Sequence, residues 1–144
     1  MEEQRDLIQE ALWEGEERLR ALLDDAMVAV YLKDLQGRYL MINRWAEIMF
    51  RISREEVVGK TDRELFPEEV ADALRANDSK TLEAEAPLRF EQLFLHEDGE
   101  YAYEATKFSL HDPTGNLYAV CGVATDITQL KQAEEALRES RSAP

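Results

Sequence analysis

Carboxylates and histidines are the side chains that could do acid–base chemistry in this sequence, but they are not grouped for it. The adjacent pairs Glu55-Glu56, Glu68-Glu69 and Glu134-Glu135 fall in predicted helices. Neighbours on a helix point about 100° apart, so the two carboxylates of such a pair do not converge on one substrate atom. Phosphate-binding glycine loops, serine elbows and HExxH pairs are absent from the sequence. We therefore expect solvated helix faces, no catalytic residues and no enzyme.

The histidines and the cysteine give equally little chemistry. His96 and His111 fall at predicted strand ends beside turns, where we expect them to face solvent. His111-Asp112-Pro113 resembles a phosphoacceptor box only superficially, because a Pro-Gly turn follows it. A single cysteine, Cys121, excludes an internal disulfide and a multi-thiolate metal site, so no metal is expected. We expect a buried, inert thiol in the last strand and a reducing, cytoplasmic location.

Composition sets wider limits. The chain has 144 residues and a formal net charge of -14, which fits one domain large enough to bury a core. This charge would repel phosphate, so neither nucleic acid nor an anionic membrane surface is an expected partner. The longest apolar stretch, residues 26–32, is far shorter than the roughly 20 residues of a membrane span. No secretory signal is recognisable at the N-terminus.

Both ends of the chain are predicted to be helical. In residues 1–26 apolar or small side chains recur every three or four positions, which predicts a coiled-coil seam and a homodimer. The alternative is an amphipathic helix packed on its own domain. Residues 129–139 have a similar spacing after Thr128, a suitable N-cap. The N-terminal seam comprises Ile8, Leu12, Gly15, Leu19, Leu22 and Ala26, and Gly15 weakens it.

The middle of the chain begins with strands and continues with helices. Runs 27–32 and 39–42 flank a glycine-containing turn and predict a hairpin. Asn43 is expected to cap a helix over residues 44–50. Two capping-box patterns, Ser53 with Glu56 and Thr61 with Glu64, predict short helices after it. A longer helix is expected over residues 67–84, with Val70, Leu74 and Leu82 facing inward.

The final third is predicted to be strands over residues 88–95, 101–110 and 117–127, separated by two strong turn sequences. Two strands, a helical block and three more strands indicate an α+β domain. We expect a five-stranded antiparallel sheet with its helices on one face, flanked by the two terminal helices. A central cavity between sheet and helices is then easy to form.

Four sequence segments together resemble the PAS domain family in order and spacing: residues 34–43, 55–61, 96–99 and 122–128. The resemblance covers about residues 19–137. It implies a sensory or dimerisation module of a bacterial signalling protein, such as a sensor histidine kinase or a diguanylate cyclase. Residues 50–53 depart from the family pattern, since many members have a glycine-containing helix end there.

The resemblance also bears on cofactors. Haem-binding relatives are expected to carry the axial histidine on the helix equivalent to residues 67–84, which has none here. A flavin photosensor would need a reactive cysteine within residues 43–50, which also has none. Haem and covalently bound flavin are therefore not expected. Noncovalent flavin, stacked on Trp45, stays open, and the ligand is unknown.

A central cavity would be lined by residues of the short helices, the longer helix and the last strands. The alternative is that these side chains fill the space themselves. Asn77 and Thr81 could add polar contacts, although an exposed helix face explains them equally well. The candidate pocket residues are Trp45, Met49, Phe50, Leu65, Phe66, Leu74, Asn77, Leu93 and Phe108.

The strand-to-helix junction carries Asp126 and Thr128. Their oxygens could simply satisfy free backbone amides at the start of a helix. The family resemblance suggests more, namely a junction that passes changes in the sheet to the last helix. We thus expect residues 1–26 to dimerise, residues 27–128 to sense and residues 129–144 to signal.

Three functions remain open at this point. The preferred one is a cytoplasmic sensor that reports a small apolar ligand, or a docked partner, to an effector in the same longer chain or in a signalling partner. The second is a ligand-free interaction domain. The third, a small enzyme that uses the cavity, has the least support.

Overall fold

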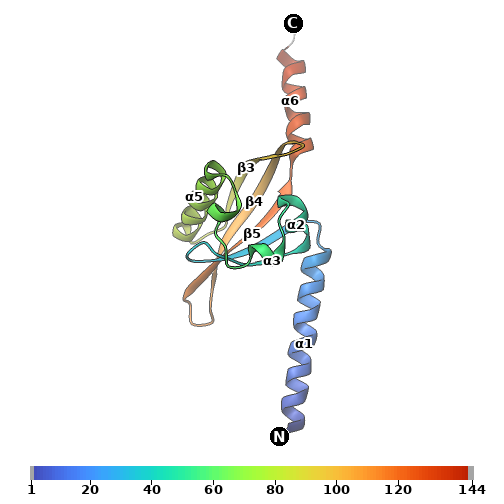
Figure 1. Cartoon of the computed structure of the whole chain (residues 1–144), viewed down its shortest axis with the longest axis vertical. Helices are drawn as coiled ribbons and strands as arrows, with labels where there is room; N and C mark the ends of the chain where they lie inside the picture. Colours follow the sequence, from blue (N-terminus) through green and yellow to red (C-terminus); the bar gives the residue numbers. More distant parts are fainter. Residues whose placement is uncertain (1, 143–144) are drawn as a thin grey trace.

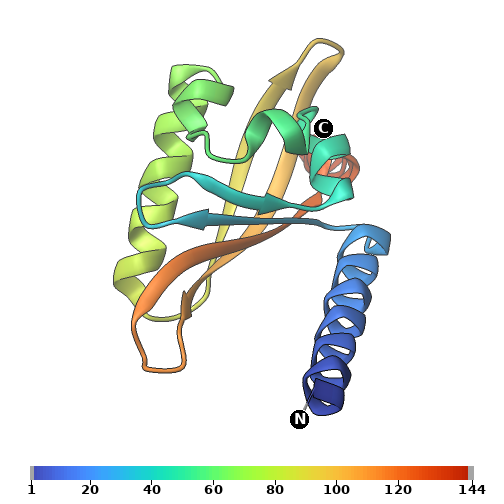
Figure 2. The same ribbon diagram turned by 60° about the horizontal axis from the view of Figure 1, so that its bottom comes forward.

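The computed structural model describes residues 2–142. A five-stranded antiparallel sheet with the spatial order β2-β1-β5-β4-β3 forms the centre, and helices cover one of its faces (Figure 2). Two helices, α1 (Glu2–Asp25) and α6 (Thr128–Ser142), extend from the domain in opposite directions (Figure 1). The predicted α+β fold is confirmed. Residues 143–144 of the predicted signalling segment lie outside the described residues.

Strands β1 (Ala29–Asp34) and β2 (Tyr39–Ile42) form the predicted hairpin. The Asp34 carboxylate closes its turn by accepting the backbone N–H groups of Gln36 and Arg38, both at 2.9 Å. Asparagine and aspartate stabilise turns in this way because the short side chain reaches the backbone two residues on. The hairpin thereby fixes the order of inward and outward side chains along β1.

Four helices connect this hairpin to the remaining strands. Asn43 caps the first of them as predicted, accepting the N–H of Ala46 at 3.0 Å. Its side chain also accepts the N–H of Val30 at 2.8 Å and donates to the carbonyl groups of Leu23 and Val28. One buried side chain therefore joins the end of α1, the start of β1 and the first turn of α2. The four helices are α2 (Arg44–Phe50), α3 (Arg54–Val57), α4 (Asp62–Leu65) and α5 (Glu68–Ala84).

One detail of the predicted helices is wrong. Ser53 precedes α3, but its side chain makes no capping hydrogen bond. Of the residues predicted to face inward from α5, Leu74 is buried, Val70 is half-buried and packs against the core, and Leu82 is half-buried. The fully buried face of α5 consists of two apolar and two polar residues, so α5 brings charge and hydroxyl groups into the interior. The four are Ala71, Leu74, Asp78 and Thr81.

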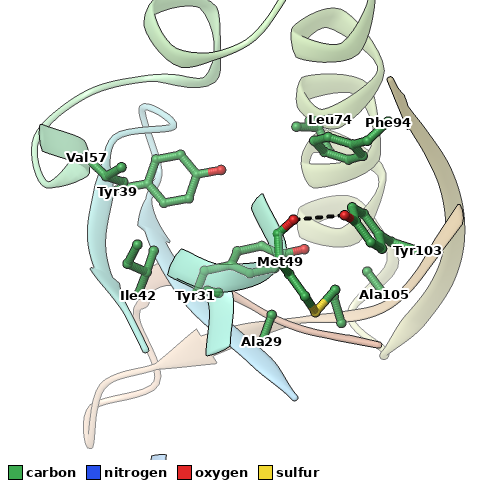
Figure 3. Close-up of a cluster of buried hydrophobic side chains, with 12 residues drawn as sticks. Ala29, Tyr31, Tyr39, Ile42, Met49, Val57, Leu74, Phe94, Tyr103 and Ala105 are labelled. Atoms are coloured by element: carbon green, nitrogen blue, oxygen red, sulfur yellow. Dashed lines mark hydrogen bonds between the residues drawn. The ribbon is translucent and has the colours of Figure 1, made fainter. Parts of the chain in front are cut away.

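The last three strands are β3 (Leu88–His96), β4 (Gly99–His111) and β5 (Leu117–Asp126), paired antiparallel in sequence order. Side chains alternate between the two faces of each strand. Phe94 and Tyr103 therefore face the helices and join the core with Tyr31, Tyr39 and Met49 (Figure 3). The core lies between the sheet and the helical layer, where the sequence places it.

Candidate functional site

A small cavity lies inside the domain between α5, the short helices and the inner face of the sheet. The space that the centre of a water molecule can occupy there is about 20 Å³, room for about one water. The cavity has a charged end and an aromatic end. Its lining residues are Tyr31, Lys33, Tyr39, Phe50, Phe66, Leu74, Asn77, Phe90, Gln92, Phe94, Tyr103, Ala105, Lys107 and Ala124.

The charged end is a buried network of two lysines, two aspartates and a tyrosine. Lys33 Nζ lies 2.6 Å from Asp62 and 2.9 Å from Asp78. Lys107 Nζ lies 2.7 Å from the other oxygen of Asp78, and the Tyr39 hydroxyl donates to Asp62 at 2.6 Å. Each lysine is 1% exposed. Two positive and two negative groups balance, which is the arrangement in which buried charge is tolerated.

The electrostatics of the network follow from burial and from these pairs. Burial by itself raises the pKa of Asp78, but the ammonium groups of Lys33 and Lys107 outweigh it, so this pKa lies below its ordinary value. Burial, and next the positive charge of Lys33, lower the pKa of Lys107 against the opposing effect of Asp78. Burial, and then the Asp62 carboxylate, raise the pKa of Tyr39. The network thus favours a charged Asp78 and a neutral Tyr39.

The aromatic end is a cluster of edge-to-face and tilted rings. Phe50 lies 5.4 Å from both Phe94 and Tyr103, and Phe66 lies 5.5 Å from Phe94, measured between ring centroids. These spacings fall in the favourable range for aromatic pairs. Phe50 and Phe66 are only partly buried, and they come from the end of α2 and the residue after α4. Two of the four rings at this end therefore belong to the short helical segments, and the other two belong to the sheet.

Tyr103 links the cluster to the backbone of α2. Its hydroxyl donates to the carbonyl oxygen of Met49 at 2.8 Å (Figure 3) and lies 2.8 Å from His96 Nε2. A tyrosine hydroxyl has one proton, so His96 Nε2 must be the donor in the second bond. Burial, and next the charge of Arg51, lower the pKa of His96. The expectation that His96 faces solvent from a turn is wrong.

Tyr31 lies flat over a glycine of the neighbouring strand. A Cβ on Gly122 would lie 2.2 to 2.4 Å from atoms of the Tyr31 ring and its hydroxyl. The register pairs Tyr31 with Gly122, so the contact is built into the sheet. Only glycine leaves room for the ring in this place, and the ring in turn reaches the cavity.

Arg51 ends α2 in the left-handed conformation, with φ of 58°. This is the conformation that glycine adopts without strain, and it lies within the segment that departs from the family pattern. The Arg51 guanidinium pairs with Asp98 at 2.7 Å and donates to the Tyr101 hydroxyl at 3.2 Å. Tyr101 also donates to Asp98 at 2.7 Å. The helix end is thereby attached to the β3–β4 turn.

The junction before α6 is a compact set of hydrogen bonds. The Asp126 carboxylate accepts the N–H of Thr128 at 2.9 Å and also its hydroxyl proton. The Thr128 oxygen accepts the N–H of Ala102 in β4 at 3.0 Å, and Ile127 N–H donates to the Ala102 carbonyl at 2.9 Å. The start of α6 is therefore attached to two strands.

The structure brings together some of the predicted pocket residues and separates others. Phe50, Phe66, Leu74 and Asn77 line the cavity. Trp45 and Leu65 pack against the core without lining the cavity, Met49 is buried in the core, and Thr81 donates to the Asn77 carbonyl. The expectation for Leu93 and Phe108 is wrong, because the register turns Phe94 and Lys107 inward and Leu93 is 56% exposed. One position along a strand changes the face.

Sequence reasoning missed the charged end entirely. Lys33 stands two residues after Tyr31, on the same face of β1, and this alternation is the signal that could have found it. Asp78 stands four residues after Leu74 on the buried face of α5. A charged residue at a position where the periodic pattern calls for an apolar side chain indicates a buried ionic group.

Other predicted features are placed as follows. The apolar residues of the α1 seam, Ile8, Leu12, Leu19 and Leu22, are each more than half exposed. Cys121 is half-buried on the outer sheet face, and burial raises the pKa of its thiol. Within residues 2–142 no group of histidine, cysteine, aspartate and glutamate side chains could hold a metal ion. None of the helices described combines the length and hydrophobicity of a membrane span.

Comparison with known proteins gives relatives in signalling. The chain is 29% identical over 128 residues to the methanogenesis regulatory histidine kinase FilI of Methanothrix harundinacea. The matched region is 88% of this chain and 14% of that protein. It is 28% identical over 119 residues to a diguanylate cyclase of Vibrio cholerae. Here the matched region is 81% of this chain and 37% of that protein. The chain thus spans well under half the length of both relatives.

The fold has a solved counterpart in the PAS domain of BvgS from Bordetella pertussis. The two share 22% identity with a TM-score of 0.67, over 88% of this chain and 98% of that one. The sequence pattern of the family described as PAS fold matches residues 23–132, from the end of α1 into α6. Since this match covers most of the chain and the sheet has the same architecture, the chain belongs to the PAS fold family.

Proposed function

We propose that the chain is a non-catalytic sensory and relay module of a larger signalling protein, with a histidine kinase or a diguanylate cyclase as the kind of effector it controls. In this proposal the state of the cavity is passed to α6, while α1 pairs with its counterpart in a second copy. The relatives support an effector in the same polypeptide, because their sequences extend far beyond the matched region. The cytoplasm is the proposed location.

One observation carries the relay, and it concerns three consecutive residues of β4. Tyr103 faces the cavity and holds the Met49 carbonyl, and Tyr101 contacts Arg51 and Asp98 on the same face. Ala102, between them, bonds to Thr128 and Ile127 at the start of α6. A shift of this strand segment therefore moves the cavity wall and the helix junction together. A switch requires two such arrangements whose balance a signal changes.

The test compares two Asp-x-Thr motifs that share the bonds between aspartate and threonine and differ in their tertiary contacts. Asp112 accepts the N–H and hydroxyl of Thr114 as Asp126 does with Thr128, but it lies in the exposed β4–β5 turn. With the chain joined to a histidine kinase core, Asp126→Ala should change autophosphorylation about fivefold, a typical coupling between sites. Asp112→Ala should leave it unchanged. Equal, unchanged activity in two folded variants would count against the relay.

The dimer has its own test. The seam residues of α1 are exposed and apolar at coiled-coil spacing, which supports pairing with a second copy. Leu12→Glu with Leu19→Glu should convert a dimer to a monomer in analytical ultracentrifugation. Glu10→Gln with Glu17→Gln, on the same helix, should leave the dimer intact. A wild-type monomer at high concentration would overturn this part of the proposal.

A second candidate is a ligand-free interaction domain. The small cavity volume favours it, since the lining side chains occupy nearly all of the interior. Native mass spectrometry and absorbance spectra of the purified chain separate the two candidates. A retained small molecule supports the sensor, and an empty domain that still controls output through a partner supports the interaction domain.

A further inference from the structure

The charged end of the cavity has more hydrogen-bond donors than acceptors. Each lysine ammonium carries three N–H groups. Lys33 uses two of them, on Asp62 and Asp78, and Lys107 uses one, on Asp78. One N–H of Lys33 and two of Lys107 are left without an acceptor among the residues that the structure describes. The Tyr31 hydroxyl likewise makes no hydrogen bond within residues 2–142.

The three side chains that carry these donors lie around one space. Lys33, Lys107 and Tyr31 all line the same cavity. Both Nζ atoms lie over the Tyr31 ring, 5.7 Å from its centre, and Lys33 Nζ also lies over the Tyr39 ring at 4.9 Å, so cation–π contacts cover part of each ammonium group. Both ammonium groups are almost fully buried, so bulk water does not satisfy them. Within residues 2–142 each fully buried side-chain nitrogen or oxygen has at least one partner, so the surplus lies in the remaining hydrogens, and buried donors of this kind are nearly always bonded. The position calls for an acceptor atom.

We propose that Lys33, Lys107 and Tyr31 form a subsite for the acceptor atom of a small, electrically neutral ligand whose ring or short apolar body lies among Phe50, Phe66 and Phe94. A carbonyl oxygen, an ether oxygen or a ring nitrogen has the required chemistry. The inference rests on the proposed sensory function, because Phe50 and Phe94 contact Tyr103 and hence the relay segment of β4.

The charge balance selects the neutral class. The four charged side chains already cancel, so a carboxylate ligand would bring an uncompensated negative charge into the interior, which costs more than it gains unless a further cation accompanies it. An ammonium ligand would place a third positive charge beside Lys33 and Lys107 and would offer donors where acceptors are needed. A neutral acceptor avoids both costs.

The ligand body requires the aromatic end to widen. The cavity admits only about one water molecule, so a ring must displace side chains. Phe50, at the end of α2, and Phe66, directly after α4, are cavity-lining rings that are only partly buried, so they can move with less loss of core packing than the buried Phe94. Displacement of Phe50 also moves the end of α2, where Arg51 contacts Asp98 and Tyr101.

The test uses four probes that share a benzene ring and differ in the head group. Acetophenone offers a neutral carbonyl, α-methylstyrene is its apolar isostere, benzoate is an anion and benzylammonium is a cation. In two-dimensional amide NMR titrations of the purified chain, acetophenone should bind at least about tenfold more tightly than the other three, the range expected for a bond to a charged donor. Equal binding of acetophenone and α-methylstyrene, tighter binding of benzoate, or no binding of any probe would overturn the subsite.

Variants locate the effect and separate it from folding. Tyr31→Phe removes a hydroxyl that has no protein partner, so the melting temperature should stay the same while acetophenone affinity falls about threefold or more. Affinity for α-methylstyrene should not change. Tyr118→Phe, on an exposed tyrosine, is the matched control. Unchanged acetophenone affinity in both Tyr31→Phe and Lys107→Met would contradict the assignment.

The outcomes also separate this inference from the proposed function. If acetophenone shows the expected selectivity but Asp126→Ala leaves kinase output unchanged, the subsite stands and the relay is wrong. If no probe binds and a crystal structure shows a single water between Lys107 and Tyr31, while Asp126→Ala still alters output, the subsite is wrong and the relay stands.

Discussion

The two ends of the cavity are built on opposite principles. At the charged end four ionised groups are held by direct bonds across β1, β4, α4 and α5, and loss of any one would leave the buried charges unbalanced. At the aromatic end rings meet through contacts that tolerate sliding, and short helices carry two of them. The comparison indicates that the charged end holds the fold in place, while the aromatic end is free to respond.

The largest expected effect is at the charged end. Asp78→Ala leaves Lys107 without its carboxylate and Lys33 with only one, so the free energy of unfolding should fall by about 3–5 kcal/mol. Urea denaturation followed by circular dichroism measures it. Asp72→Ala, two turns earlier on the exposed face of α5, should change little, because surface ion pairs contribute little. A loss below about 1 kcal/mol for Asp78→Ala would remove the distinction between the ends.

The aromatic end should also be costly to empty, but through packing rather than charge. Phe94→Ala is expected to lower the free energy of unfolding by about 3 kcal/mol or somewhat more, as is usual for a large side chain removed from a core. Leu95→Ala, the next residue along β3 and 81% exposed, should stay within about 0.5 kcal/mol of wild type. Similar losses in both variants would show that β3 has a different register.

Gly122 lies under Tyr31, whose ring contacts both the charged end and the aromatic end of the cavity. A substitution at Gly122 therefore tests how tightly the two ends are joined. Gly122→Ala should destabilise by about 1–3 kcal/mol because the new methyl group and the Tyr31 ring cannot share the space. Gly15→Ala should instead stabilise by about 0.5–1 kcal/mol, since Gly15 is in the interior of α1 with open space around it. Thermal denaturation should show a lower melting temperature for Gly122→Ala and a higher one for Gly15→Ala than for wild type. A neutral Gly122→Ala would mean that Tyr31 moves freely.

Acid should weaken the charged end selectively. The pKa of Asp78 is lower in the folded chain than its ordinary value, so its contribution is complete above the unfolded pKa of about 3.9 and is lost as the pH falls through the folded pKa. The stability difference between wild type and Asp78→Asn should be constant above about pH 5 and shrink below about pH 4. Urea titrations from pH 7 to pH 2 test this. A difference that grows toward low pH would contradict the direction of the pKa shift.

The smallest expected effect on stability is at the edge of the aromatic end. Arg51→Gly removes exposed polar contacts but also relieves a left-handed residue, and these changes oppose each other, so the melting temperature should hardly change. Kinase output of the fused protein should nevertheless shift, because α2 loses its attachment to the β3–β4 turn. Asp112→Ala again serves as the control. Unchanged output would show that Arg51 is not part of the relay.

Much of the fold could be predicted because its signals are local. Asn43, the turn at Asp34 and the turn at Asp112 act within a few residues, so their types reveal helix starts and hairpins directly. The Asp126 and Thr128 pair was also visible as a junction. Its bond to Ala102 was not, because that partner lies 26 residues away along the chain.

The candidate site could be predicted only in part, since strand register decides which side chains enter it. The apolar character of β3 and β4 was plain, but Leu93 and Phe94 look equally suitable in the sequence, and pairing alone selects Phe94. A slip by one residue exchanges the inner and outer faces. This is why Leu93 and Phe108 were placed wrongly and Lys107 was missed.

By itself the sequence determined the elements, their order and the α+β class, because helix and strand periodicity, caps and turns are properties of neighbouring residues. The tertiary structure alone decided that Lys33 meets Asp78, 45 residues further along, and that Asp78 also meets Lys107. Charged side chains are stable in an interior only as a complete set. Completeness depends on four elements folding together, which no local pattern specifies.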